Sequence, residues 1–215
     1  MKFKLFILSL ILAGCSSDTI NETSIQKPKK DFSALLVKYR DISLDTLELH
    51  YYSEEGDKSK FFGSYIDSTK THLLPKELVS SEYYIDIFAC YKFKIDNTKT
   101  GLITRTPSMY ESASINLLIY DQYIDSITQN IQLATEWGDA GATFNQTSWL
   151  FFNSKKELCA LTSEKYSYDH SIEDEKDTIV EYKTKYYFTN ITTNTKDTVK
   201  TNYENLLYLK EKANH

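Results

Sequence analysis

The stretch YYIDIFACYKFKID, residues 83–96, contains the clearest strand signal in the chain. Its apolar residues recur at every second position: Ile85, Ile87, Ala89, Tyr91, Phe93 and Ile95. Because side chains along a β-strand point alternately to opposite faces, this spacing predicts that all six lie on one face of a half-buried strand. The stretch therefore indicates an antiparallel sheet.

Three further segments show the same alternation. These are residues 113–121 (Ala113, Ile115, Leu117, Ile119), residues 125–134 (Ile127, Ile131, Leu133) and residues 178–188 (Val180, Tyr182, Tyr186, Phe188). Short polar runs at 96–101, 153–156 and 194–196 predict hairpin turns between strands. The composition, with 17 Tyr and 11 Phe but 6 Gly and 3 Pro, also favours strands.

Together these signals predict a mainly β fold in residues 31–215: a single-domain antiparallel meander, arranged as a sandwich or as an open barrel-like sheet. The final segment differs from the rest, because Thr201 and Glu204 have capping-box spacing ahead of a helical apolar stripe. Residues 201–212 are therefore predicted to form a short C-terminal helix.

Residues 1–14 have the three parts of an export signal. Lys2 and Lys4 precede an apolar run at 5–12, and Ala13 and Gly14 supply the small residues that a signal peptidase needs. A membrane-spanning helix would need about 20 apolar residues, and this run has roughly half that number. The segment is therefore predicted to be a signal peptide that is removed.

The residues Leu12-Ala13-Gly14-Cys15 resemble the lipobox of bacterial lipoproteins. The resemblance implies that Cys15 receives a diacylglyceryl group and becomes the new N-terminus, so that acyl chains hold the protein on a membrane. Ser16 stands where an Asp resembles an inner-membrane retention signal, which favours the outer membrane. Residues 15–30 are polar and predicted to be a flexible tether, and the periplasmic and surface faces are both left open.

Net charge and cysteine content narrow the classes of partner. The formal net charge is −5. Without a stripe of Lys or Arg to neutralise phosphates, nucleic acid is not an expected partner. Cys90 and Cys159 lie in strand-like segments, and two buried thiols are favoured over a disulfide, which an exported compartment would allow. No cysteine or histidine spacing indicates zinc, and no cofactor is expected.

Residues 135–144, TEWGDAGATF, form the most unusual stretch of the chain. Trp137 and Asp139 are the candidate ligand-binding residues, because a Trp beside an Asp can stack on a sugar and hydrogen-bond it. The alternative, which the sequence favours, is a tight loop whose glycines adopt positive φ and whose Trp137 covers the end of the core.

Two other motifs have a structural and a functional interpretation. The acidic run at 168–177 surrounds His170 with carboxylates, but it lacks the spacing and the glycine of a calcium loop, so a solvated hairpin tip is favoured over a metal site. Asp followed by Ser or Thr and an apolar residue occurs at 45–47, 125–127, 177–179 and 197–199. These tripeptides resemble an O-glycosylation motif of Bacteroidota, although an Asp that caps the turn before a strand is the favoured explanation.

The sequence contains no recognisable catalytic signature. A G-x-S-x-G elbow, an H-E-x-x-H helix and a P-loop are all absent, and the four histidines are scattered. Two function classes follow. The favoured one is a lipid-anchored cell-envelope protein that binds a protein or carbohydrate partner without catalysis. The alternative is an envelope-tethered hydrolase acting on glycans, which would need a pair of carboxylates at fixed separation.

Overall fold

The computed structural model describes residues 32–51, 60–79, 86–108, 114–172 and 178–199. Cys15, the predicted tether and the predicted helix at 201–212 lie outside these ranges. Within them the chain is mainly β, as predicted. The strands are β1 (Arg40–Asp41), β2 (Thr46–Leu49), β3 (Ser64–Tyr65), β4 (Phe88–Lys94), β5 (Lys99–Thr106), β6 (Ser114–Asp121), β7 (Ser126–Asp139), β8 (Ala142–Phe152), β9 (Leu158–Asp169), β10 (Val180–Asn190) and β11 (Thr195–Thr198).

The helices of the described residues are short. They are α1 (Ser33–Leu36), α2 (Ser68–Thr71), α3 (Lys76–Val79) and the 3₁₀ turn η2 (His170–Ile172). None of them has the length and apolar character needed to cross a membrane. The sheet therefore dominates this part of the chain.

Strands β4 to β11 follow one another in an antiparallel meander, which confirms the predicted arrangement. Three additions were not predicted: β1 pairs with β4 in parallel, β3 pairs with the same strand antiparallel, and β2 pairs with β8. All eleven strands of the described residues belong to a single sheet.

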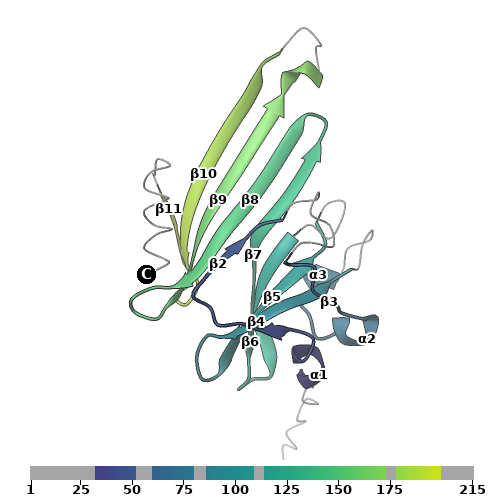
Figure 1. The fold of residues 1–215 in the computed structure, drawn as a ribbon, viewed down its shortest axis with the longest axis vertical. Coiled ribbons are helices and arrows are strands. Elements are labelled where there is room, and N and C mark those ends of the chain that lie inside the picture. Colours follow the sequence, from purple (N-terminus) through teal and green to yellow (C-terminus); the bar gives the residue numbers. More distant parts are fainter. Residues whose placement is uncertain (1–31, 52–59, 80–85, 109–113, 173–177, 200–215) are drawn as a thin grey trace, which may run out of the picture.

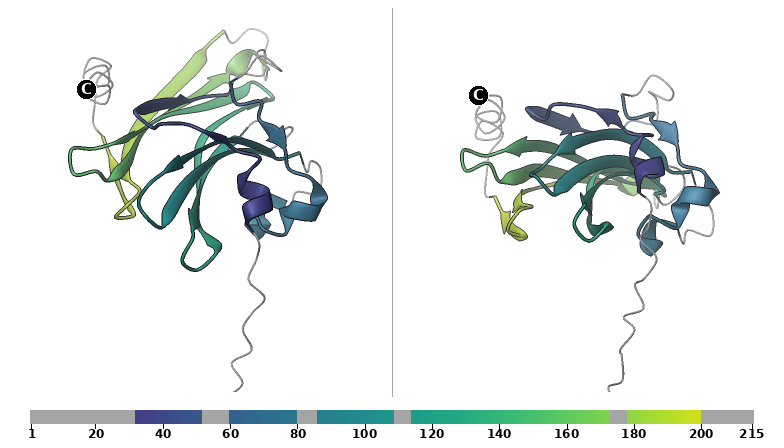
Figure 2. Two further views of the ribbon diagram at one scale, coloured as in Figure 1. Left: turned by 60° about the horizontal axis from the view of Figure 1, so that its bottom comes forward. Right: turned by 90° about the horizontal axis from the view of Figure 1, so that it is seen from below.

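Strand β7 divides this sheet into two leaves. Its residues 126–135 pair with β6, whereas residues 135–139 pair with β8, so that only Thr135 belongs to both ladders. Strand β2 occupies the neighbouring stretch of β8, residues 148–151. We call β1 and β3–β6 the short leaf, and β2 and β8–β11 the long leaf. Figure 1 shows β8–β10 extending beyond the strands of the short leaf, and Figure 2 shows the curvature of the sheet between them.

The main hydrophobic core takes side chains from both leaves. Its fully buried members include Leu49, Ile103, Ile115, Leu117, Leu150, Leu158 and Ala160. A second core lies on the other face of the short leaf, where α1 and the segments around α2 and α3 contribute Phe32, Leu35, Ile66, Leu73 and Leu74 against Ile87, Leu102 and Leu118. The short leaf is thus covered on both faces.

This double coverage corrects the expectation of half-buried strands. In β6, residues 115, 117 and 119 face the main core as predicted, but residues 114–120 are all buried because Leu118 and Tyr120 pack in the second core. In β4 the register shifts between Ala89 and Tyr91. Because of this irregularity, Ile87 and Ala89 pack in the second core, whereas Phe93 lies in the main core and Tyr91 and Ile95 pack against it. The alternating apolar residues of 85–95 therefore do not share one face, contrary to the prediction. Ile85 lies outside the described residues.

Both described cysteines, Cys90 and Cys159, are buried free thiols, which agrees with the favoured interpretation. Their strands lie in different leaves, β4 in the short leaf and β9 in the long leaf. The sequence had placed both in strand-like segments, and that placement is confirmed.

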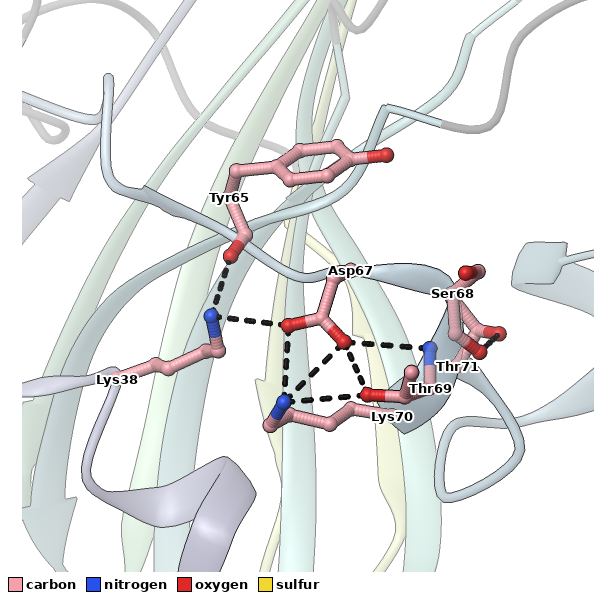
Figure 3. A network of polar contacts seen from close by, with 7 residues as sticks. All are labelled: Lys38, Tyr65, Asp67, Ser68, Thr69, Lys70 and Thr71. Carbon is pink, nitrogen blue, oxygen red and sulfur yellow. Dashed lines mark hydrogen bonds and ion pairs between the residues drawn. The ribbon is translucent and has the colours of Figure 1, made fainter.

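Asp67 joins the two small helical elements at the second core (Figure 3). It is the N-cap of α2, and its side chain accepts hydrogen bonds from the backbone N–H and the hydroxyl of Thr69. Lys70 donates to the same carboxylate at 2.9 Å. Lys38, just beyond α1, forms an ion pair with Asp67 at 3.3 Å and donates to the Tyr65 carbonyl oxygen at 2.9 Å. One carboxylate therefore fixes α2 to the end of α1.

Candidate functional site

The WGDAG stretch forms the tip of the β7–β8 hairpin. Asp139 pairs with Ala142, and the two intervening residues, Ala140 and Gly141, have φ of 45° and 83°. Two successive residues with positive φ are the signature of a tight type I′ turn. A Cβ at Gly141 would lie 2.8 Å from the carbonyl oxygen of Asp169, so the turn is also closely packed. The predicted tight loop with a positive-φ glycine is confirmed at Gly141, but the prediction is wrong for Gly138, which lies within β7 and does not have a positive φ.

Trp137 is half-buried and stacks on Phe144, which faces it from β8. The ring centroids are 5.6 Å apart and the planes differ by 23°. Trp137 is not a member of either hydrophobic core, so it does not cover the end of the core. Asp139 is exposed, and its carboxylate forms no hydrogen bond or ion pair within the described ranges. The structure therefore places both candidates on the same hairpin. Trp137 contacts a neighbouring side chain, whereas the Asp139 side chain is exposed.

The strand register continues this aromatic contact across the long leaf. Phe144 lies opposite Trp137 on one side and Tyr166 of β9 on the other, and Tyr166 lies opposite Lys183 of β10. A hollow of about 330 Å³ opens on this face. We call it the aromatic hollow; its lining residues are Phe144, Glu164, Tyr166, Lys183 and Lys185. Trp137 is not among these lining residues, but it stacks on Phe144, which is.

The aromatic hollow lies on the same face of β8 and β9 as the main core. Cross-strand pairs along that face change in character with distance from the core: Leu150 with Ala160, Ser148 with Thr162, Gln146 with Glu164, and Phe144 with Tyr166. The second pair is buried and joined by a 2.8 Å hydrogen bond between its hydroxyls. A satisfied polar layer thus ends the core, and a more open aromatic layer follows it.

The opposite face of the long leaf is polar at this level. Thr143 and Ser167 are joined by a 2.7 Å hydrogen bond between their hydroxyls. Tyr182, in the same cross-strand row, has 79% of its surface exposed and belongs to no aromatic contact with another described residue. The hollow, with its aromatic walls and charged rim, is therefore the more favourable of the two faces for a ligand.

Two charge types meet at the hollow. Glu164 lies opposite Lys185 in the β9–β10 ladder, and Lys183 lies opposite Tyr166. The three charged side chains offer ammonium donors and carboxylate acceptors beside two aromatic rings. Binding sites for small molecules combine apolar walls with a few polar groups in this manner.

The described part of the acidic run does not form a metal site. No group of three or more metal-ligating side chains occurs among the described residues, and residues 173–177 lie outside them. The carboxylate of Asp169 accepts hydrogen bonds from Ser171, which hold the pKa of Asp169 below its usual range. The Nε2 atom of His170 lies 3.2 Å from a carboxylate oxygen of Glu181.

The repeated Asp tripeptides have different positions in the fold. Asp45 and Asp125 each stand immediately before a strand, as predicted, and Asp125 has a φ of 50°. The Asp125 carboxylate does not cap the turn, because it accepts a hydrogen bond from the Tyr120 hydroxyl at 2.8 Å and its other oxygen has no partner. The turn interpretation is also wrong for Asp197, which lies within β11 opposite Phe188. Asp177 lies outside the described residues.

Sequence reasoning identified Trp137 but missed Phe144 and Tyr166. A signal was present, because a two-residue turn at residues 140–141 fixes the register and places residue 144 opposite residue 137.

No family model, curated protein or solved structure matches this chain.

Proposed function

We propose that this protein is a lipid-anchored, non-enzymatic binding protein of the cell envelope, and that its aromatic hollow takes a carbohydrate. The observation that supports this proposal is the hollow beside Phe144 and Tyr166. A sugar ring has apolar C–H faces that pack on aromatic rings, and hydroxyl groups that bond to ammonium and carboxylate groups such as those of Lys183 and Glu164.

Binding is tested with the purified full-length processed protein and three probes: oligosaccharides of glucose in α and β linkage, and oligosaccharides of N-acetylglucosamine. Calorimetry should show binding of at least one probe. Phe144→Ala and Tyr166→Ala should each weaken it about tenfold, which corresponds to about 1.4 kcal/mol. Tyr182→Ala, on the opposite face, is the matched control and should bind normally.

Failure of all three probes, or equal loss with Tyr182→Ala, would overturn the carbohydrate proposal. The same incubations separate binding from the alternative, an envelope-tethered hydrolase acting on glycans. Unchanged oligosaccharide length supports a binding protein. Shorter products that accumulate with time would support the hydrolase.

The anchor is tested independently through Cys15. In an exporting bacterial host, the mass of the protein extracted from membranes should correspond to a chain that begins at Cys15 and carries acyl chains. The Cys15 thiol is the acceptor for the lipid, so a variant without this thiol should not be anchored. Cys15→Ala should move the protein out of the membrane fraction, whereas Ser17→Ala, a matched change nearby, should not. A Cys15→Ala protein that stays in the membrane fraction and is processed normally would contradict the proposal.

A further inference from the structure

Arg105 is a buried arginine near the C-terminal end of β5. The chain contains two arginines, and this one has 7% of its surface exposed. It lies opposite Phe88 in the β4–β5 ladder, two positions beyond Ile103, which faces the main core. A guanidinium group is always charged in proteins, so burial requires compensation from its surroundings.

Aromatic rings cover the guanidinium group. Its central carbon lies 4.1 Å from the ring centroid of Phe88 and 5.1 Å from that of Phe62. Such contacts attract the cation to the rings, but they leave the N–H groups at its edge without acceptors. The Nε atom of Arg105 is buried and has no hydrogen-bond partner, and in the described ranges no acidic side chain pairs with the guanidinium.

The neighbouring ionisable group does not supply the missing negative charge. Burial raises the pKa of the Cys90 thiol to about 11, although the nearby Arg105 acts in the opposite direction. The thiol is therefore neutral at physiological pH and does not balance the positive charge of Arg105. A buried hydrogen-bonding group without a partner is uncommon and calls for an explanation.

Exposed aromatic surface lies beside this cation. Phe62 and Tyr65 have 39% and 48% of their surfaces exposed, and both contact Phe88 with ring centroids 5.9 Å and 5.8 Å apart. The cluster therefore offers a charged donor group at its centre and apolar rings at its rim. The members of this cluster are Phe62, which lies just before β3, Tyr65 of β3, Phe88 of β4 and Arg105 of β5.

We propose that Arg105 is the centre of an anion-binding site for a small acid with an apolar body. The guanidinium edge would donate to a carboxylate or phosphate group, because these oxygens match its fork of N–H donors. The apolar body would pack on Phe62 and Tyr65. This site lies on the short leaf, and the inference does not depend on the carbohydrate proposal for the long leaf.

The ligand chemistry is tested by thermal unfolding of the full-length processed protein at constant ionic strength. The probes are benzoate and phenyl phosphate, with acetate and inorganic phosphate as anions that lack a ring, and benzyl alcohol as a ring that lacks a charge. A ligand of the folded state raises the melting midpoint with its concentration. We expect at least one of benzoate and phenyl phosphate to raise the melting midpoint. Benzoate should raise it more than acetate does if the site takes a carboxylate, and phenyl phosphate should raise it more than inorganic phosphate does if the site takes a phosphate.

The role of Arg105 is tested with Arg105→Met and Arg105→Lys. Arg105→Met should abolish the response and, without ligand, melt at the wild-type midpoint or above it, because it removes an uncompensated buried charge. Arg105→Lys keeps the charge without the fork and should respond more weakly. Arg40→Met is the matched control, since Arg40 stacks on Tyr91 at 4.6 Å and donates to the Lys60 carbonyl oxygen.

Three results would each overturn the proposal. The first is that neither benzoate nor phenyl phosphate raises the wild-type midpoint. The second is that Arg105→Met retains the full response, or that Arg40→Met loses it. The third is that Arg105→Met unfolds well below the wild-type midpoint in ligand-free buffer, because Arg105 would then be a structural residue whose contacts with Phe88 and Phe62 suffice.

Discussion

Ala140 shows how a single residue can conflict with the turn that contains it. Its φ of 45° is in the left-handed region, where a Cβ approaches the following carbonyl group and costs roughly 1–2 kcal/mol. Asn and Gly are the residues that tolerate this conformation, and Asn-Gly is the preferred pair for a two-residue hairpin turn. The hairpin geometry therefore holds Ala140 in a conformation that its own side chain disfavours.

Replacing Ala140 by Asn should raise the free energy of unfolding by about 1 kcal/mol, because it removes part of this penalty. Denaturant unfolding of the two proteins measures the difference. Gly141→Ala is the control of opposite sign, since its new Cβ would meet the Asp169 carbonyl oxygen at 2.8 Å. An Ala140→Asn protein that is less stable than wild type would show that the turn is not strained at this position.

Among the secondary-structure elements, α2 is too short to persist without capping. It has four residues, and its N-cap residue Asp67 also forms an ion pair with Lys38 from the segment after α1. Hydrogen bonds from Thr69 and Lys70 hold the pKa of Asp67 well below its usual range, so the folded state favours the ionised carboxylate. The stabilisation is complete above about pH 4, the ordinary pKa of Asp, and is lost as the pH falls below it.

Asp67→Asn should therefore lower the thermal midpoint at neutral pH, and the difference from wild type should shrink as the pH falls below about 4. Melting curves across that range provide the measurement. Asp139→Asn is a suitable comparison, because the carboxylate of Asp139 is exposed and has no partner among the described residues. A deficit in Asp67→Asn that stays constant with pH would mean that ionisation of Asp67 does not stabilise the fold.

The elements also show where a period-two pattern is reliable. It located β4, β6 and β7, but it assumed an unbroken pleat, and irregularities in β4 and β7 move apolar residues from one face to the other. Ile127 packs with the second core, whereas Ile131 and Leu133 pack with the main core. A bulge leaves little trace in a single sequence, because the residues on both faces are apolar when both faces are buried.

For the molecule as a whole, the sequence predicted the antiparallel meander but not its division into two leaves. Adjacent strands in a meander follow from chain order, whereas the pairing of β2 with β8 depends on which edge is vacant after β7 changes partner. The sequence likewise predicted only part of the candidate sites, because residue type is visible in a sequence whereas strand register and burial are not. Trp137 was notable by its type, while Phe144 joined it only through register, and Arg105 became notable only through its burial.

The place of β2 beside β8 also determines an order of events in time. Its residues 46–49 pair with residues 151–148, roughly a hundred positions later in the chain, and such distant contacts form slowly because a long loop must close first. As the chain emerges, the backbone of β2 has no strand to pair with until β8 is present. The main core therefore cannot close around an N-terminal fragment, and a chain that ends before Ser148 would expose the apolar side of its short leaf.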